Sequence, residues 1–260
     1  MVVKELKNLF SFLTIFPVAM DKDLLTDCAR NMWAFPLIGA FIGLLAGLFG
    51  WVAYQFLPGI VVGALVLAVL LWMTGLHHTD GLLDFGDGVM AHGSFEHKIE
   101  VMPDQLTGAG AIGLCLMTYL ITAFAFAELG RTVFIGNFAL PLIVPALIVV
   151  ELCAKLSMVV AAWAGKSVHQ GMNSAFLEAM HGNKGNLRLI AALAICFAIA
   201  LPLLGWAGAF TVLAGVITGL VMVAVAHKHF NGVTGDVFGA TNELTRMVCV
   251  IVLLAVAAWV

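Results

Sequence analysis

Three aspartates recur at helical spacing directly after a long apolar run of the chain. Asp80, Asp84 and Asp87 lie four and three residues apart, and on a helix that turns about 100° per residue these positions share one narrow arc. Three carboxylates on one face repel one another unless a cation or several hydrogen-bond donors neutralise them. Because carboxylate oxygens are hard ligands that suit Mg²⁺, and also Mn²⁺, the spacing predicts a divalent-metal site.

A second acidic pair, Glu100 and Asp104, also has helical spacing. The segment between the two groups, residues 88–99, is long enough to turn and bring this pair opposite the first. Two metal ions bridged by these acids would hold a diphosphate and stabilise charge on the leaving phosphate. A remaining carboxylate would then take the proton from an attacking hydroxyl. A single aspartate in such a place is more often a helix cap, but five acids at these spacings favour the metal site.

The composition places these acids in a membrane protein. Of 260 residues, 62% are hydrophobic and 10% are charged, whereas about a quarter of the residues are charged in soluble proteins. We therefore expect an all-α, polytopic membrane helical bundle that forms a single domain over residues 1–260, with about seven transmembrane helices and a range of roughly six to eight. The amphipathic segment before Pro17 is expected to lie along the membrane interface. The expected spans are residues 32–55, 60–76, 107–127, 138–164, 188–205, 209–226 and 247–260.

Two features of the expected spans concern helix packing. Gly39, Gly43 and Gly47 recur on one face of the first span, which suits close approach of a second helix. Glu151 and Lys155, four residues apart in the fourth span, predict a neutralised pair that pins helices, in preference to a lysine that reaches a phosphate. The five cysteines stand singly, so they indicate neither disulfides nor zinc.

The basic residues predict the orientation in the membrane. With seven spans and the N-terminus inside, ten of the twelve lysines and arginines face the cytoplasm, while Arg131 faces out and Lys155 is buried. This orientation puts three long polar loops, residues 77–106, 165–187 and 227–246, on the cytoplasmic side. We therefore expect a protein of the cytoplasmic membrane whose active face is cytoplasmic. A net charge of -3 without a basic block gives no indication of a nucleic-acid partner.

The first acidic stretch resembles a family signature. His78-x-Asp80-Gly81-Leu82-x-Asp84-x-x-Asp87-Gly88 is similar to the signature of the membrane cobalamin synthases, the adenosylcobinamide-GDP ribazoletransferases. Three further segments are similar to family segments in the same order, so the resemblance covers nearly the whole chain. They are Phe35-Pro36-Leu37-Ile38-Gly39, Glu100-x-Met102-x-Asp104 with Gly108, and Thr234-Gly235-Asp236-x-x-Gly239-Ala240 with Glu243. The Asp84-x-x-Asp87-Gly88 stretch also resembles the opening of the CDP-alcohol phosphotransferase motif, without the Ala-Arg that follows there.

The resemblance implies a transferase of late cobalamin biosynthesis. In it, a ribose hydroxyl of α-ribazole, or of its 5′-phosphate, attacks adenosylcobinamide-GDP and releases GMP. The metal-binding set implied for Mg²⁺ is Asp80, Asp84, Asp87, Glu100 and Asp104. Asp104 becomes the proposed catalytic base by analogy with the fourth carboxylate of the CDP-alcohol enzymes, and Asp80 is the second catalytic residue. The bilayer is the remaining partner, and the sequence leaves the oligomeric state open, a homo-oligomer included.

Phosphate charge must be met by basic residues away from the acids. The family commonly has basic residues around the position of Asp104, where this chain has none. Lys98 and Lys166 are the lysines we expect to contact substrate, with Lys155 and Lys184 as the other choices. Each of these lysines is a weak candidate by itself, because a loop lysine beside a membrane usually anchors the orientation of the protein in the bilayer.

Other substrate contacts are expected from polar residues near glycines and span ends. Asp236 follows Gly235 in a glycine-rich turn, where the backbone could approach a phosphate or guanine. His78 is expected to contact substrate, with an interfacial or capping histidine as an equal alternative. Asn173 is a further contact, to a corrinoid amide.

Two other functions fit parts of the pattern. A membrane divalent-cation transporter also holds acids within a helical bundle, but near the bilayer midplane and often in repeated halves. Here the acids follow the ends of spans and no internal repeat is evident. A lipid enzyme like the CDP-alcohol phosphotransferases is the other alternative. A purely structural subunit would leave the acidic set unexplained.

Overall fold

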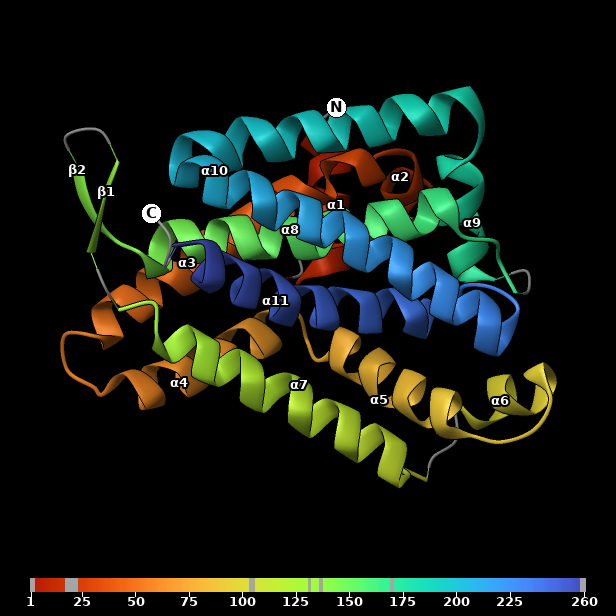
Figure 1. The fold of residues 1–260 in the computed structure, drawn as a ribbon. Coiled ribbons are helices and arrows are strands. Elements are labelled where there is room, and N and C mark those ends of the chain that lie inside the picture. The colour runs from red at the N-terminus through yellow and green to blue at the C-terminus, as the bar shows by residue number, and fades with distance from the viewer. Residues whose placement is uncertain are drawn as a thin grey trace.

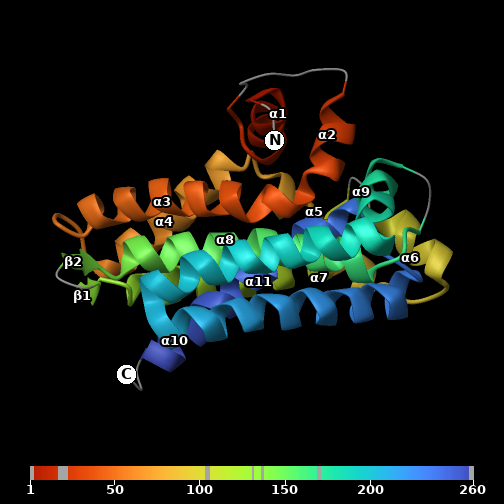
Figure 2. The ribbon, with the colours of Figure 1, turned by 90° about the horizontal axis from the view of Figure 1, so that it is seen from above.

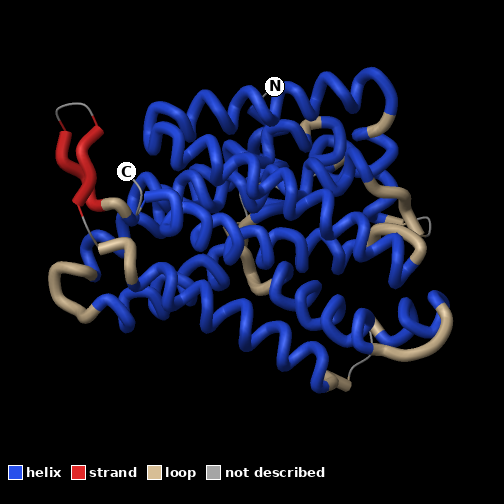
Figure 3. The backbone as a smooth tube through the Cα atoms, viewed as in Figure 1, coloured by secondary structure: helices blue, strands red, loops and turns tan. Residues whose placement is uncertain are grey.

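The computed structural model of the protein describes residues 3–16, 23–102, 106–130, 132–135, 138–168 and 171–257. Within them the chain is almost entirely helical, which confirms the expected all-α class (Figure 3). A two-stranded hairpin, which the sequence did not indicate, is the exception in this part of the chain. The elements in order are α1 (Val3–Leu13), α2 (Leu24–Arg30), η1 (Met32–Ala34), α3 (Phe35–Ala53), α4 (Gly59–Met73), α5 (His77–Met90), α6 (Phe95–Val101), α7 (Ala109–Ala127), β1 (Thr132–Ile135), β2 (Phe138–Pro141), α8 (Ile143–Ala164), α9 (Met172–Met180), α10 (Gly182–Phe230) and α11 (Gly235–Ala257).

The described helices supply the expected number of membrane crossings. Five are long and apolar enough to span a bilayer: α3 with η1, α7, α8, α10 and α11. The pair α4 and α5, bent by 98°, makes a sixth if it counts as one broken span. The 49-residue α10 is two helices joined at Gly205, so it contributes two crossings. The polytopic bundle of about seven spans is thereby confirmed.

The chain reverses direction within α10. Gly205 has φ 55° and ψ -135°, a conformation that residues with a Cβ rarely adopt. A Cβ at Gly208 would collide with the carbonyl oxygen of Ala200. In a straight helix, which rises about 1.5 Å per residue, residues eight positions apart are too far from each other for such a contact. Figure 1 shows the two halves of α10 running side by side in opposite directions. They correspond to the spans expected at 188–205 and 209–226.

Helix α8 forms the centre of the bundle and is buried along nearly its whole length. It packs against α3, α10 and α11. On α3, a Cβ at Gly43 would collide with the carbonyl oxygen of Leu147, and one at Gly39 with that of Glu151. The small-residue face predicted for the first span is therefore confirmed as the surface on which α3 meets α8.

Helix α11 carries charged residues into the bundle where we expected a polar loop. The prediction of a loop over residues 227–246 is wrong, because α11 begins at Gly235 and buries both Glu243 and Arg246. Arg246 forms ion pairs with Glu151 of α8 and with Glu243. A guanidinium between two carboxylates can remain inside a membrane bundle because each charge has a partner.

Lys155 belongs to the same buried network. Its Nζ donates a hydrogen bond to Oδ1 of Asn242 at 2.6 Å, and the amide of Asn242 donates to Glu243 at 3.0 Å. The expected ion pair between Glu151 and Lys155 is therefore wrong, because Glu151 pairs with Arg246 and Lys155 with Asn242. Both residues nevertheless tie α8 to α11. Lys155 is 0% exposed, so it does not extend into a loop to meet a phosphate.

The chain bends sharply just before the aspartates. We expected the second span, residues 60–76, to run straight into them. Instead, α4 ends at Met73, Gly75 and Leu76 adopt φ values of 66° and 61°, and α5 leaves at 98° to α4. Helix α5 then packs against α7 and α11. The bend thus separates the acidic helix from the apolar span and presents it to α11.

The polar segments gather at one end of the bundle. Figures 1 and 2 show α6 and α9 at one end, and the β1–β2 hairpin with the turn inside α10 at the other. The hairpin pairs Thr132 with Pro141, so α8 starts at Ile143, later than the residue 138 predicted. Figure 2 shows α1 end-on beside spans seen lengthwise, so α1 runs across the spans, as an interfacial helix does.

Candidate functional site

The three aspartates of the first stretch all lie on α5, as their spacing predicted. Asp80 is exposed, while Asp84 and Asp87 are half-buried. A Cβ at Gly81 would lie 2.9 Å from the backbone oxygen of Asp236, on α11. Only a glycine therefore lets α5 approach α11 this closely, and the approach brings the two acidic segments together.

Asp236 is the acid that faces the α5 set. The carboxylates that act on Asp84 are those of Asp236, Asp80 and Asp87, the strongest first, and no basic side chain of the described chain is among them. Converging carboxylates without a cation are unfavourable, so this arrangement suits a hard divalent cation. We had expected Asp236 to contact phosphate or guanine. Beside three like charges, its carboxylate is better placed to bind a metal than an anion.

Asp87 has a second role that its spacing did not reveal. Its carboxylate accepts hydrogen bonds from the backbone N–H groups of Gly108, at 2.6 Å, and Ala111, at 2.8 Å. These groups belong to the first turn of α7, whose positive end stabilises a carboxylate. Part of the charge repulsion on α5 is therefore met by helix donors, while the remaining lone pairs of Asp87 stay available to a cation.

The second acidic pair is only partly described. Glu100 is exposed on α6 and is not among the charges that act on Asp84. Asp104 lies outside the described residues, so its predicted roles as ligand and base stay predictions. Within the described ranges, no group of three or more His, Cys, Asp or Glu side chains is already arranged around a metal position. Metal binding would therefore require the side chains on α5 and α11 to move together.

Basic groups lie beside the far end of α5. Nζ of Lys98 on α6 is 3.2 Å from Nδ1 of His229, in the last turn of α10. The adjacent Phe230 packs against Phe85 of α5, with ring centroids 5.8 Å apart. Lys166 is exposed, and its backbone N–H donates to Nε2 of a second histidine of α10. Sequence reasoning missed His229 because residues 227–229 were expected in a loop.

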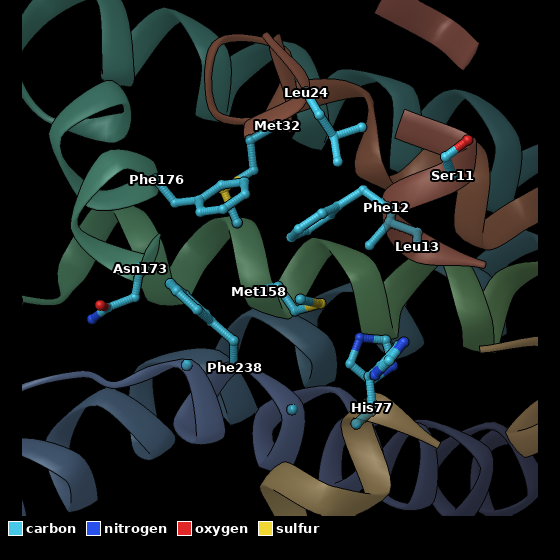
Figure 4. Close-up of a pocket in the computed structure, with 13 residues that line it drawn as sticks. Ser11, Phe12, Leu13, Leu24, Met32, His77, Met158, Asn173, Phe176 and Phe238 are labelled. Atoms are coloured by element: carbon cyan, nitrogen blue, oxygen red, sulfur yellow. The ribbon is translucent and has the colours of Figure 1, made fainter. Parts of the chain in front are cut away.

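A cavity of about 400 Å³ lies beside the acids and collects the other predicted substrate contacts (Figure 4). His78, Asn173 and Gly235, from three distant parts of the chain, all line it. The amide of Asn173 donates hydrogen bonds to the hydroxyl of Ser167 and to the carbonyl of Val233, at 3.1 and 2.8 Å. Asn173 therefore holds the cavity wall, and its contact with a corrinoid amide stays a prediction.

The chain is similar to known proteins over nearly its full length. The family model described as cobalamin-5-phosphate synthase matches residues 5–254. The adenosylcobinamide-GDP ribazoletransferase of Methanosarcina barkeri is 31% identical over 258 residues, which cover 95% of this chain and 90% of that protein. Proteins of the same name from Methanococcoides burtonii and Thermococcus kodakarensis are 28% and 31% identical, over 95% and 96% of this chain and 90% and 98% of their own. No solved structure matches the chain.

Proposed function

Since the chain belongs to the cobalamin-5-phosphate synthase family, we propose that it joins adenosylcobinamide-GDP to α-ribazole or to α-ribazole 5′-phosphate in a late step of cobalamin synthesis. A ribose hydroxyl of the ribazole attacks the phosphorus that carries the cobinamide. The bond from this phosphorus to GMP breaks, and the hydroxyl proton passes to a carboxylate. The observation that carries the proposal is the contact of α5 with α11 at Gly81, which brings Asp236 within electrostatic range of Asp84, as Asp80 and Asp87 on α5 also are.

These four acids would hold Mg²⁺, or Mn²⁺ in its place. Their chemistry fits such an ion, because every donor is a hard oxygen and the described charges acting on Asp84 include no cation. When bound, the metal would neutralise the diphosphate and stabilise the departing phosphate of GMP. Glu100 and Asp104 remain proposed members of the set. Support for them comes from Met102, two residues before Asp104, which packs against Gly88 of α5.

Asp80 and Asp104 are the proposed proton acceptors. Asp80 is the exposed member of the α5 set, so it can pass a proton to water after each turnover. The role of Asp104 rests on the analogy with CDP-alcohol enzymes.

The phosphates of the substrate would be met by Lys98 and His229, with Lys166 as a further contact. Lys98 and His229 come from α6 and α10 and touch each other near the end of α5. A lysine and an imidazole so placed can donate to phosphate oxygens that extend past the acids. This pair supplies the basic contacts that the segment around Asp104 lacks.

The reaction would take place at the cytoplasmic surface of the cytoplasmic membrane. The gathering of α6 and α9 at one end of the bundle supports a single working face (Figure 1). Lys98, Lys166 and Lys184 belong to segments at that end, as the positive-inside rule expects of a cytoplasmic face.

A divalent-cation transporter is less well supported. Transport sites need acids near the midplane that are not already neutralised. The buried acids Glu151 and Glu243 are both paired with Arg246. The acids of the proposed site, by contrast, lie where α5 contacts α11 at Gly81, close to the polar end.

The direct test uses the purified full chain in lipid nanodiscs. With adenosylcobinamide-GDP, α-ribazole and Mg²⁺, we expect GMP release that stops when EDTA is added. A CDP-activated lipid in place of the cobinamide substrate should give no CMP. The proposal would be abandoned if no GMP formed while the same preparation carried Mn²⁺ into liposomes, or if CMP formed instead.

A further inference from the structure

The cavity beside the acidic set is placed to hold one end of a substrate. Its walls come from α1, α2, η1, α5, α8, α9 and α11. Gly235 and Gly239 line it and flank Asp236 in the sequence, while His77 and His78 line it just before Asp80. A molecule bound here therefore has its open end next to the carboxylates that the proposed reaction uses.

Three phenylalanines form an aromatic wall in this cavity. The ring of Phe176, on α9, has its centroid 5.3 Å from that of Phe12 on α1 and 6.5 Å from that of Phe238 on α11. Figure 4 shows these three rings together with Met158 of α8. Aromatic rings and a thioether favour a flat aromatic ligand, which buries both of its faces against them.

His78 adds a buried polar group to the lining of the same cavity. It is 9% exposed, and its Nδ1 has no hydrogen-bond partner among the described residues. A buried imidazole nitrogen without a partner costs stability. A ligand that brings one matching polar atom into the cavity would remove that cost.

From these observations we propose that the cavity is the subsite for the benzimidazole base of the ribazole nucleoside. The inference rests on the proposed transferase function and names the part of the site that selects its second substrate. The bicyclic base stacks among Phe12, Phe176 and Phe238, and its free ring nitrogen accepts a hydrogen bond from His78. The ribose then lies at the mouth of the cavity, with a hydroxyl directed to the acids on α5 and α11.

The other parts of the substrates fit this cavity poorly. About 400 Å³ lies at the low end of the range of ligand sites, roughly 300 to 1,000 Å³, and takes a nucleoside but not a corrin ring with its amide side chains. Guanine carries several donors and acceptors, and the mostly apolar lining of the cavity would leave some of them unpaired. A benzimidazole carries a single free ring nitrogen, which matches the single unpaired nitrogen of His78.

Two variants test the aromatic wall, one by removing a ring and one by reducing the volume of the cavity. Phe176→Leu removes a ring face, and Met158→Phe fills part of the cavity. For each we expect the KM for α-ribazole to rise about tenfold, because lost ring contacts of this kind are worth roughly 1.4 kcal/mol. The KM for adenosylcobinamide-GDP should stay within about twofold of the wild-type value, since each of these constants reports its own subsite.

Phe124→Leu is the matched control. Phe124 is 53% exposed on α7 and does not line the cavity, so both KM values should remain those of the wild type. Equilibrium dialysis of α-ribazole against the full chain measures the same affinity without turnover. A wild-type chain that binds α-ribazole but releases no GMP would leave the subsite standing and reject the proposed reaction. Equal affinities of wild type, Phe176→Leu and Met158→Phe for α-ribazole would reject the subsite. A lipid chain found bound in the cavity would reject it as well.

A pair of ligands tests the contact with His78. The α-riboside of indole has the shape of the α-riboside of benzimidazole but lacks the free ring nitrogen. Wild-type protein should bind the indole riboside about tenfold more weakly, because the imidazole hydrogen bond is lost. In His78→Leu the two ribosides should bind equally. A preference for benzimidazole that survived in His78→Leu would overturn the assignment of this contact.

Discussion

Asp84 and Asp87 lie one helical turn apart on α5, yet their surroundings differ. Asp87 accepts two backbone hydrogen bonds from the start of α7. Asp84 lies within electrostatic range of the carboxylates of Asp236, Asp80 and Asp87. The same side chain therefore stabilises the fold at one position and destabilises it at the other, where a bound cation would reverse the effect.

Removing the Asp87 carboxylate should lower the stability of the protein. We expect Asp87→Ala to reduce the free energy of unfolding by about 1–2 kcal/mol, as for the loss of other helix caps. Asp80→Ala is the control, because Asp80 is exposed and its removal relieves repulsion. Unfolding titrations in SDS and mixed micelles would measure both. An equal loss in the two variants would show that the α7 cap does not stabilise the fold.

At the scale of the elements, α3, α8 and α11 form a unit that holds α5 in place. Glycines let α3 contact the backbone of α8, and a buried charge network ties α8 to α11. Helix α11 in turn meets α5 at Gly81. The position of Asp236 opposite Asp84 therefore depends on packing that lies well inside the membrane bundle.

A side chain added at the α3–α8 contact should separate the two helices. A Cβ at Gly43 would collide with the carbonyl oxygen of Leu147, whereas one at Gly113 on α7 would meet nothing within 4 Å. We expect Gly43→Ala to lower the unfolding free energy by about 1–3 kcal/mol. Gly113→Ala should leave it unchanged or raise it by up to about 1 kcal/mol. Thermal unfolding in detergent would compare them, and equal midpoints would argue against close α3–α8 packing.

Removing only the positive charge from the buried network of Arg246, Glu151 and Glu243 should strongly destabilise the protein. Arg246→Met leaves Glu151 and Glu243 unpaired, and we expect a loss of about 3–5 kcal/mol in the free energy of unfolding. Adding Glu151→Gln and Glu243→Gln should restore most of it, because no buried charge is then left alone. If the triple variant were no more stable than Arg246→Met, the charges would not be what ties α8 to α11.

At the scale of the whole molecule, the sequence predicts those features that composition and residue spacing determine. Composition indicates the membrane bundle, and spacing alone puts Asp80, Asp84 and Asp87 on one helix. Arg246 looked like a loop residue because the carboxylate of Glu151 that neutralises it lies 95 positions away. Asp236, likewise, could be assigned to α11 only once the folded chain was known. Features that depend on which helices pack together were not predictable from one sequence.

The distribution of the loops predicts which residues can be labelled from each side. Ser94, before α6, belongs to the polar end, and Gln55, between α3 and α4, belongs to the opposite end. In vesicles whose cytoplasmic face is inside, a membrane-impermeant maleimide should label Gln55→Cys but not Ser94→Cys. The unsubstituted chain, whose described cysteines are buried or half-buried, is the background control. The reverse labelling pattern would contradict the proposed orientation.

The dependence of GMP release on Mg²⁺ concentration tests the central proposal most directly. For wild type, Asp84→Asn and Asp236→Asn, the initial rate would be followed as Mg²⁺ is raised, after checking that all three unfold at similar temperatures. We predict that both variants lose at least about a hundredfold in rate and need more Mg²⁺ for half their maximum, because each removes a metal ligand. Variants that matched the wild-type rate and Mg²⁺ dependence would show that the acids between α5 and α11 are not the metal site.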